Sequence, residues 1–121
     1  MSITVPLPGI VQPPVTTSLT TTSKTDVFTA SDKANEVVVS ISVANKTASG
    51  VDVTLEWHDG SSDFIFWMKS VAAKTTEIVS DLPLALSSRH GNTQKIKATA
   101  GTGNAVSVTV VSAMDMAQQG R

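Results

Sequence analysis

The chain has 121 residues, a length that suits one domain with a single core. Nine basic and ten acidic side chains leave a net charge of −1, so no overall field attracts a nucleic acid or an anionic membrane. Charged residues make up 16% of the chain, less than the roughly 25% of an ordinary soluble domain, which favours a surface that contacts other protein. The absence of cysteine excludes disulfides, thiolate metal sites and cysteine nucleophiles.

Residues 1–23 differ in composition from the rest and are predicted to form an extended N-terminal arm. Four prolines interrupt "MSITVPLPGIVQPP", and "TTSLTTTS" has no helical period. The prolines also argue against a secretory signal. The sequence contains no run of 18 apolar residues, so it does not predict a transmembrane helix. The alternative is a terminus that is disordered in the isolated protein. In an assembly we expect the apolar side chains of the arm to dock on a neighbouring copy; they are Ile3, Val5, Leu7, Ile10 and Val11.

From residue 24 to 113 the hydrophobic period is two, which predicts β-strands. "EVVVSISV" would place Val37, Val39, Ile41 and Val43 on one face, and "VDVTLEWH" would place Val51, Val53, Leu55 and Trp57 inward. "KTDVFTA", "DFIFWMK", "TTEIVS", "QKIKATA" and "AVSVTVVSA" complete about seven strands, with residues 114–121 as a tail. The sequence therefore predicts an all-β protein, a single antiparallel β-sandwich that is Ig-like or jelly-roll-like.

Two turns in this region predict hairpins between consecutive strands. "NKTASG" would join the strands at 36–45 and 51–58, and the glycine-rich "GTGN" would join the last two strands. The irregular "DLPLALSSRHGN" carries Leu82, Leu84 and Leu86, which are expected to close one end of the core.

The segment "WHDGSSDFIFW" (57–67) gathers residue types that catalysis and metal binding use. His58 or His90 could activate Ser61, Ser62, Ser87 or Ser88, but no G-x-S-x-G elbow is present. His58, Asp59, Asp63 and His90 are possible metal ligands without a recognised spacing. A hairpin loop explains "HDGSSD" better, so we predict no catalytic, cofactor-binding or metal-binding residue and no enzyme activity.

"FIFWM" (64–68) is apolar on both faces of a strand, so one face must be covered by another layer or remain exposed. This predicts a protein interface that contains Ile65 or Trp67. Lys95 and Lys97 are too few for a nucleic-acid surface, and "AGTGNA" lacks the full pattern of a phosphate loop.

Two stretches within residues 24–113 carry a common pattern. In "VVVSISVANKTASGVDVTLEW" a core strand leads through a polar turn into its partner, and in "LPLALSSRHGNTQKIKATAGTGNAVSVTV" a leucine-rich segment and a polar turn precede the last two strands. By this pattern residues 24–113 resemble the small β-sandwich virion proteins of tailed bacteriophages. The resemblance implies a structural subunit of a virion assembled in the host cytoplasm, most simply capsid decoration or cement, otherwise a neck or tail accessory protein. The implied partners are copies of itself and major capsid, neck or tail proteins, with no nucleic acid, membrane or cofactor.

A carbohydrate- or receptor-binding module is the alternative of another class. In that case Trp57 or Trp67 would face a sugar together with His58, Asp59 and Asp63. The inward position predicted for Trp57 argues against it.

Overall fold

The computed structural model describes residues 10–31, 35–80, 84–86 and 93–114, and the regular secondary structure in these ranges is all strand. No helix in these ranges is long and apolar enough to cross a membrane. The all-β prediction is confirmed. The strands are β1 (Ile10–Val11), β2 (Val15–Leu19), β3 (Thr25–Thr29), β4 (Glu36–Asn45), β5 (Val51–His58), β6 (Asp63–Val71), β7 (Thr75–Val79), β8 (Leu84–Leu86), β9 (Lys95–Ala100) and β10 (Val106–Met114).

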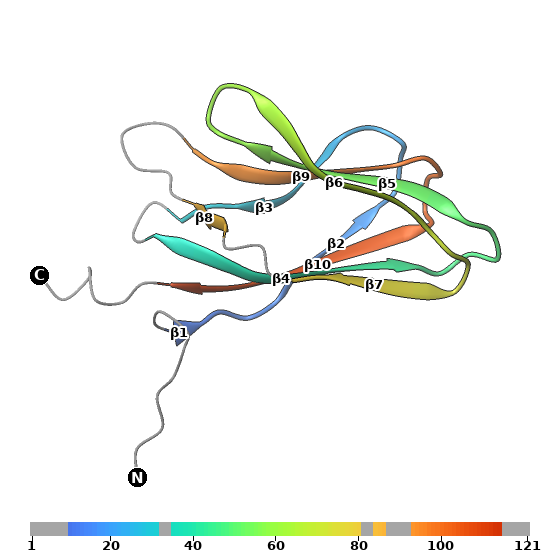
Figure 1. The fold of residues 1–121 in the computed structure, drawn as a ribbon, viewed down its shortest axis with the longest axis horizontal. Helices are drawn as coiled ribbons and strands as arrows, with labels where there is room; N and C mark the ends of the chain where they lie inside the picture. The colour runs from blue at the N-terminus through green and yellow to red at the C-terminus, as the bar shows by residue number, and fades with distance from the viewer. Residues whose placement is uncertain (1–9, 32–34, 81–83, 87–92, 115–121) are drawn as a thin grey trace, which may run out of the picture.

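Two antiparallel sheets pack face to face (Figure 1). In sheet A, β1 and β2 follow each other along one side of β10, and β7 and β8 both pair with β4. Sheet A therefore has four rows in the order β1/β2, β10, β4 and β7/β8, while sheet B has the order β3, β9, β5 and β6. Compared with the seven predicted strands, β1, β2 and β8 are additional.

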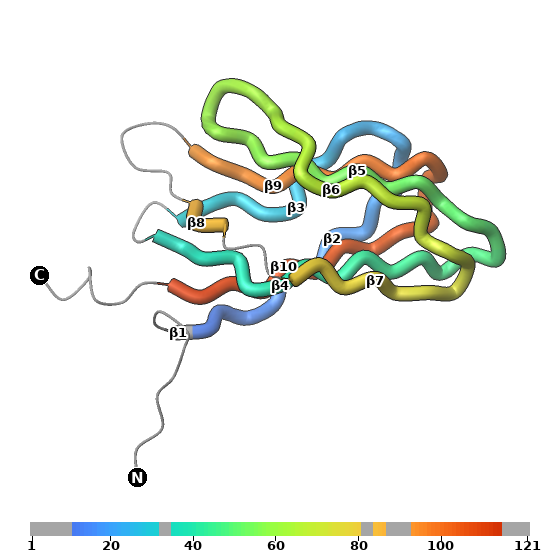
Figure 2. Tube along the Cα trace, in the orientation of Figure 1, coloured from blue at the N-terminus to red at the C-terminus, as the bar shows by residue number. Residues whose placement is uncertain are grey.

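The order of the rows identifies a jelly roll. Numbered along the chain, the eight rows run 1-8-3-6 in sheet A and 2-7-4-5 in sheet B, the arrangement of a two-sheet jelly roll. An Ig-like sandwich would keep its first two strands in the same sheet, whereas β2 and β3 lie in different sheets. Figure 2 shows the connections after β4, β6 and β9 crossing between the layers at one end of the molecule.

Both hairpins predicted from "NKTASG" and "GTGN" are wrong, because each turn joins the two sheets. β4 and β10 belong to sheet A, while β5 and β9 belong to sheet B. An alternating pattern shows which side chains face the core, but a strand in either sheet has the same alternation. At the second turn, a Cβ on Gly103 would lie 2.8 Å from the carbonyl oxygen of Thr20, so glycine is needed for the close approach.

The predicted face of β4 is also wrong in its first half. Val38, Ile41 and Val43 are fully buried, whereas Val37 and Val39 are only partly buried. The ladder with β10 pairs Val38 with Ser112 and Ser40 with Val111, so a β-bulge at Val39 changes the phase of the alternation.

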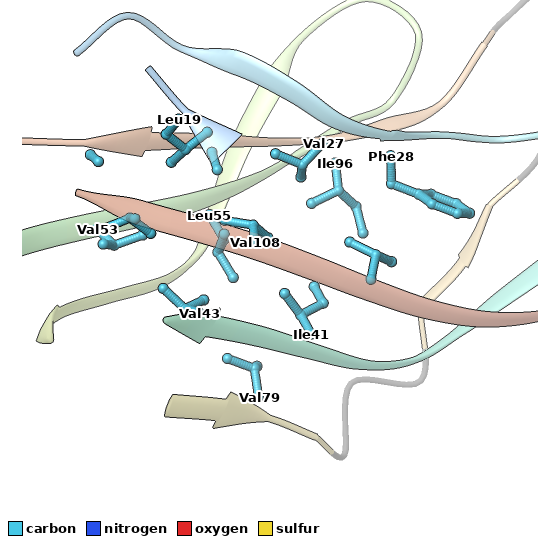
Figure 3. Packing of buried hydrophobic residues seen from close by; sticks show 14 of the residues in the cluster. Leu19, Val27, Phe28, Ile41, Val43, Val53, Leu55, Val79, Ile96 and Val108 are labelled. Atoms are coloured by element: carbon cyan, nitrogen blue, oxygen red, sulfur yellow. The ribbon is translucent and has the colours of Figure 1, made fainter. Parts of the chain in front are cut away.

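The core lies between the sheets and consists mainly of Val, Ile, Leu and Ala side chains, some of which are drawn in Figure 3. Val51, Val53 and Leu55 are buried as predicted. Leu86 is fully buried and Leu84 packs against the core, so both occupy the position expected of them; Leu82 lies outside the described residues.

The sandwich begins before the predicted boundary between residues 23 and 24. β2 pairs with β10 from Val15 to Leu19, and Leu19 is only 1% exposed. Residues 15–19 are therefore an edge strand of the same domain rather than part of a separate arm. Residues 1–9 and the tail at 115–121 lie outside the described residues.

Candidate functional site

The "HDGSSD" loop connects β5 and β6 as a true hairpin. Asp59 organises it, because its Oδ1 accepts hydrogen bonds from the backbone N–H groups of Ser62 (2.8 Å) and Ser61 (2.9 Å). These two bonds hold the pKa of Asp59 below 3.8. Gly60 has a φ of 102°, which favours glycine. Of the serines considered as nucleophiles, Ser61 and Ser62 thus bind Asp59 through their backbone.

A polar network centred on Asp63 covers part of sheet B. The Asp63 carboxylate lies 2.7 Å from Nδ1 of His58, 2.9 Å from Nζ of Lys24 and 3.4 Å from Nζ of Lys97. Lys24 also contacts Glu56 at 2.8 Å. The hydrogen bonds from Lys24 and His58 hold the pKa of Asp63 well below its usual range, and those to Glu56 and Asp63 raise the pKa of Lys24.

This network accounts for the histidine and carboxylate side chains that the sequence gathers near residue 60. The register pairs Glu56 of β5 with Lys97 of β9, and Lys97 with Asp26 of β3, so negative and positive groups alternate across three strands. Among the described residues, no hydrogen bond joins His58 to a serine, and no group of three or more His, Asp or Glu side chains could hold a metal ion. His90, Ser87 and Ser88 lie outside the described residues. The geometry supports charge compensation on a sheet surface.

The aromatic side chains of the segment lie on the inner side of sheet B. Trp57 is opposite Ile96, and Trp67 is opposite Leu55; both tryptophans pack against the core. The ring of Phe64 lies 5.9 Å from that of Trp57. His58 and Asp63 alternate with these residues and therefore lie on the outer side of the sheet. The tryptophans and the polar side chains that a sugar site would need together thus lie on opposite sides of the sheet. Trp57 Nε1 is buried without a hydrogen-bond partner in the described ranges.

Strand β6 exposes apolar side chains on the outer side of sheet B. A bulge at Phe66 places Ile65 opposite Glu56 and Met68 opposite Thr54. Ile65 is 57% exposed and Met68 is 66% exposed. Of the two predicted interface residues on this strand, Ile65 is presented to solvent, whereas Trp67 faces the core. Met68 was missed by the sequence reasoning, because the alternation does not reveal a bulge.

The outer side of sheet A carries no charge on the strand positions that cross its centre. The register aligns Thr16, Thr109, Ser42 and Ile78 in one row across the sheet, and Ser18, Ser107, Ala44 and Thr76 in the next. Thr16 and Thr109 share a hydrogen bond of 3.0 Å between their hydroxyls. The charges and the small uncharged side chains are therefore segregated between the two outer faces.

The predicted interface residues of the N-terminal segment are only partly within the described ranges. Val11 is exposed at the edge of sheet A, where it pairs with Ala113. The backbone of Ile10 pairs with Met114. Ile3, Val5 and Leu7 lie outside the described residues.

A groove of about 570 Å³ opens between the edges of β2 and β3, and the sequence did not predict it. Phe28 and Val27 form part of its lining. Glu36 also lines the groove, is almost fully buried, and accepts hydrogen bonds from the Ser31 N–H (2.6 Å) and the Ser112 hydroxyl (3.2 Å). Glu36 thereby ties β4 to β10 and to the segment after β3.

Comparisons with known proteins identify solved structures of similar fold. No family model matches the chain, and no curated protein matches it. A structure of Bacillus endospore appendages, described as disulfide-linked pili, aligns over 94% of this chain and 98% of that chain, with 10% identity and a TM-score of 0.50.

Two further solved structures are similar at lower scores. The crystal structure of PirA aligns over 84% of this chain and 90% of that chain, with 13% identity and a TM-score of 0.48. A viral particle of IBDV aligns over 88% of this chain and 31% of that chain, with 10% identity and a TM-score of 0.45. At these identities the likeness concerns the fold alone.

Proposed function

We propose that the protein is a structural subunit that assembles with copies of itself and with other proteins of a particle. The observation that carries this proposal is the exposed apolar surface at Ile65 and Met68, on a jelly roll whose neighbouring charges are already paired with one another. Exposed apolar surface rimmed by polar groups is a mark of protein contact sites, so the pair Ile65 and Met68 favours a protein contact. The similarity in fold to a pilus subunit is consistent with a structural role.

In its finer form the proposal is a decoration or cement protein on the capsid of a tailed phage, with a neck or tail accessory subunit as the alternative. The partners would then be the major capsid protein or neck and tail proteins, and the location would be the virion. Because the chain has no cysteine, its assembly would depend on packing rather than on disulfides. Many repeated copies would allow modest interfaces to add through avidity.

Three measurements test the proposal on the full chain. Sedimentation velocity across a range of concentrations should detect oligomers, which negative-stain microscopy should show as rings or filaments. Co-sedimentation with purified particles should saturate at a fixed copy number, on isolated capsids for the decoration role and on isolated tails for the alternative. A protein that remains monomeric at all concentrations and binds neither capsids nor tails would overturn the proposed function.

A further inference from the structure

The free edge of sheet B at β6 has the features of an acceptor for another strand. Within the described residues β6 pairs with β5 alone, so its other side is unpaired. On the outer side, Ile65 and Met68 flank the bulge and lie opposite Glu56 and Thr54, which are two positions apart on β5. The two apolar side chains therefore repeat at about 7 Å, the spacing of alternate residues in a strand.

The outer side of this edge is also accessible. A shallow recess of about 380 Å³ lies beside Met68, lined by Asp52, Thr54 and Ser70 among others. The charged side chain at the edge, Lys69, lies on the inner side, where it forms a 3.0 Å ion pair with Glu77 of β7. Inward charges of this kind are one means of protecting an edge, but this pair leaves the outer side free for apolar contact.

The sequence of residues 1–9 has the complementary pattern. In an extended chain, the side chains of Ile3, Val5 and Leu7 share one face, and their N–H and C=O groups share one edge. The opposite edge belongs to the even-numbered residues, where Pro6 and Pro8 have no N–H to donate. Such a segment pairs through one edge only and prevents a further strand from adding, as is typical of proline in edge strands.

The position of β1 makes a second copy the natural acceptor. Residue 10 pairs with Met114 in the first row of sheet A, whereas β6 is the last row of sheet B (Figure 1). The edge rows of a four-stranded sheet are about 14 Å apart, and the sheets are about 10 Å apart. Nine extended residues reach about 30 Å, so crossing to β6 of the same copy would use most of the segment before it could run along that strand.

We propose that residues 1–9 of one copy add to the β6 edge of a second copy as a fifth strand of its sheet B, with Val5 and its apolar neighbours against Ile65 and Met68. The donor segment precedes β1 in the first row of sheet A, and the acceptor is β6 in the last row of sheet B, so the contact is head-to-tail and builds a ring or a filament. This inference rests on the proposed function, because it specifies the contact between copies.

Single cysteine substitutions test the contact directly, since the natural chain has none. After oxidation, a mixture of Val5→Cys and Met68→Cys chains should give disulfide-linked dimers of one chain of each kind. The control mixture of Val5→Cys and Ile78→Cys should give few, because Ile78 is similarly exposed, at 65%, but lies on β7 of the other sheet. A chain carrying both Val5→Cys and Met68→Cys that closes the disulfide within a monomer would overturn the proposal.

Charge substitutions test the direction of the contact. Val5→Lys and Met68→Lys should each raise the dissociation constant for self-association at least tenfold, while Ile78→Lys should leave it unchanged. Mixing the Val5→Lys and Met68→Lys chains should restore association but stop it at a dimer, because one chain retains the acceptor and the other retains the donor. If the wild-type protein assembles and all three variants assemble equally well, this inference fails and the proposed function stands. A wild-type protein that neither self-associates nor binds particles would overturn both.

Discussion

At the scale of single residues, Asp63 has three polar partners on the outer side of sheet B among the described residues. It accepts hydrogen bonds from Lys24 and His58 and lies near Lys97, and the sequence listed it as a possible metal ligand. The positions of Lys24 and Lys97 could not be anticipated, because they are 39 and 34 residues away along the chain and come from other parts of the sheet. Its role as the centre of a network therefore depends on strand order.

The low pKa of Asp63 predicts a pH dependence of stability. Its folded pKa lies below the unfolded value, so its contribution to the free energy of unfolding is complete above the unfolded pKa of about 3.8 and is lost as the pH falls towards the folded pKa. The wild-type protein should thus lose stability more steeply between about pH 5 and pH 2 than Asp63→Asn, as measured by chemical denaturation at each pH.

The matched control is Asp52→Asn, which removes an exposed carboxylate from the same side of the sheet without touching the network. It should retain the steeper wild-type slope at low pH. Equal slopes for Asp63→Asn and the wild-type protein would show that the network contributes nothing to acid sensitivity.

At the scale of elements, β2 shows why the extent of the sandwich was underestimated. "VTTSL" has one aliphatic residue at each end and three hydroxyl side chains between them, which is a weak strand signal. Its pairing with β10 and the burial of Leu19 make it the edge row of sheet A. The long-range partner thus determines its structure more than its own composition does.

This assignment predicts a clear difference between two substitutions in β2. Leu19→Ala should lower the free energy of unfolding by about 2–5 kcal/mol, since it removes a fully buried side chain from the core. Val15→Ala, at a position that is 43% exposed, should change it by less than about 0.5 kcal/mol. Urea denaturation checks both values, provided that the dependence of the free energy of unfolding on urea concentration is the same in both variants. A negligible effect of Leu19→Ala would show that residues 15–19 are an arm outside the core.

Asn45 illustrates a stabilising contact that no sequence pattern revealed. The buried side chain donates hydrogen bonds to the carbonyl oxygens of Ser49 (2.8 Å) and Val71 (3.0 Å), and it accepts one from the backbone N–H of Thr47 (2.9 Å). It thereby connects the turn after β4 to the end of β6 in the other sheet. In the sequence, Asn45 reads only as the first residue of a turn.

At the scale of the whole molecule, the two outer faces differ in character. Sheet B carries a charge network in which Lys24, Glu56, Asp63 and Lys97 compensate one another. Sheet A presents small hydroxyl and aliphatic side chains, and apolar groups are exposed at β6. A head-to-tail contact at β6 would leave both outer faces largely free for other partners in a particle.

Assembly through apolar contacts predicts a weak dependence on salt. Raising the salt concentration from about 0.1 M to about 1 M shortens the screening length from roughly 10 Å to roughly 3 Å, which weakens exposed charge pairs but not apolar burial. The dissociation constant for self-association should therefore change by less than about threefold, as measured by sedimentation equilibrium. A steep loss of association with salt would instead assign the contact to the charged face of sheet B.

The all-β class, the inward face of β5 and the β5–β6 hairpin all follow from the sequence, because alternation and turn chemistry are local properties of the chain. The assignment of strands to sheets does not, and this is why two of the three turns were mistaken for hairpins. The bulges at Val39 and Phe66 and the partners of Asp63 likewise depend on which strand lies alongside. Hydrogen bonds between distant segments settle these features, and a period of two carries no information about the identity of the neighbour.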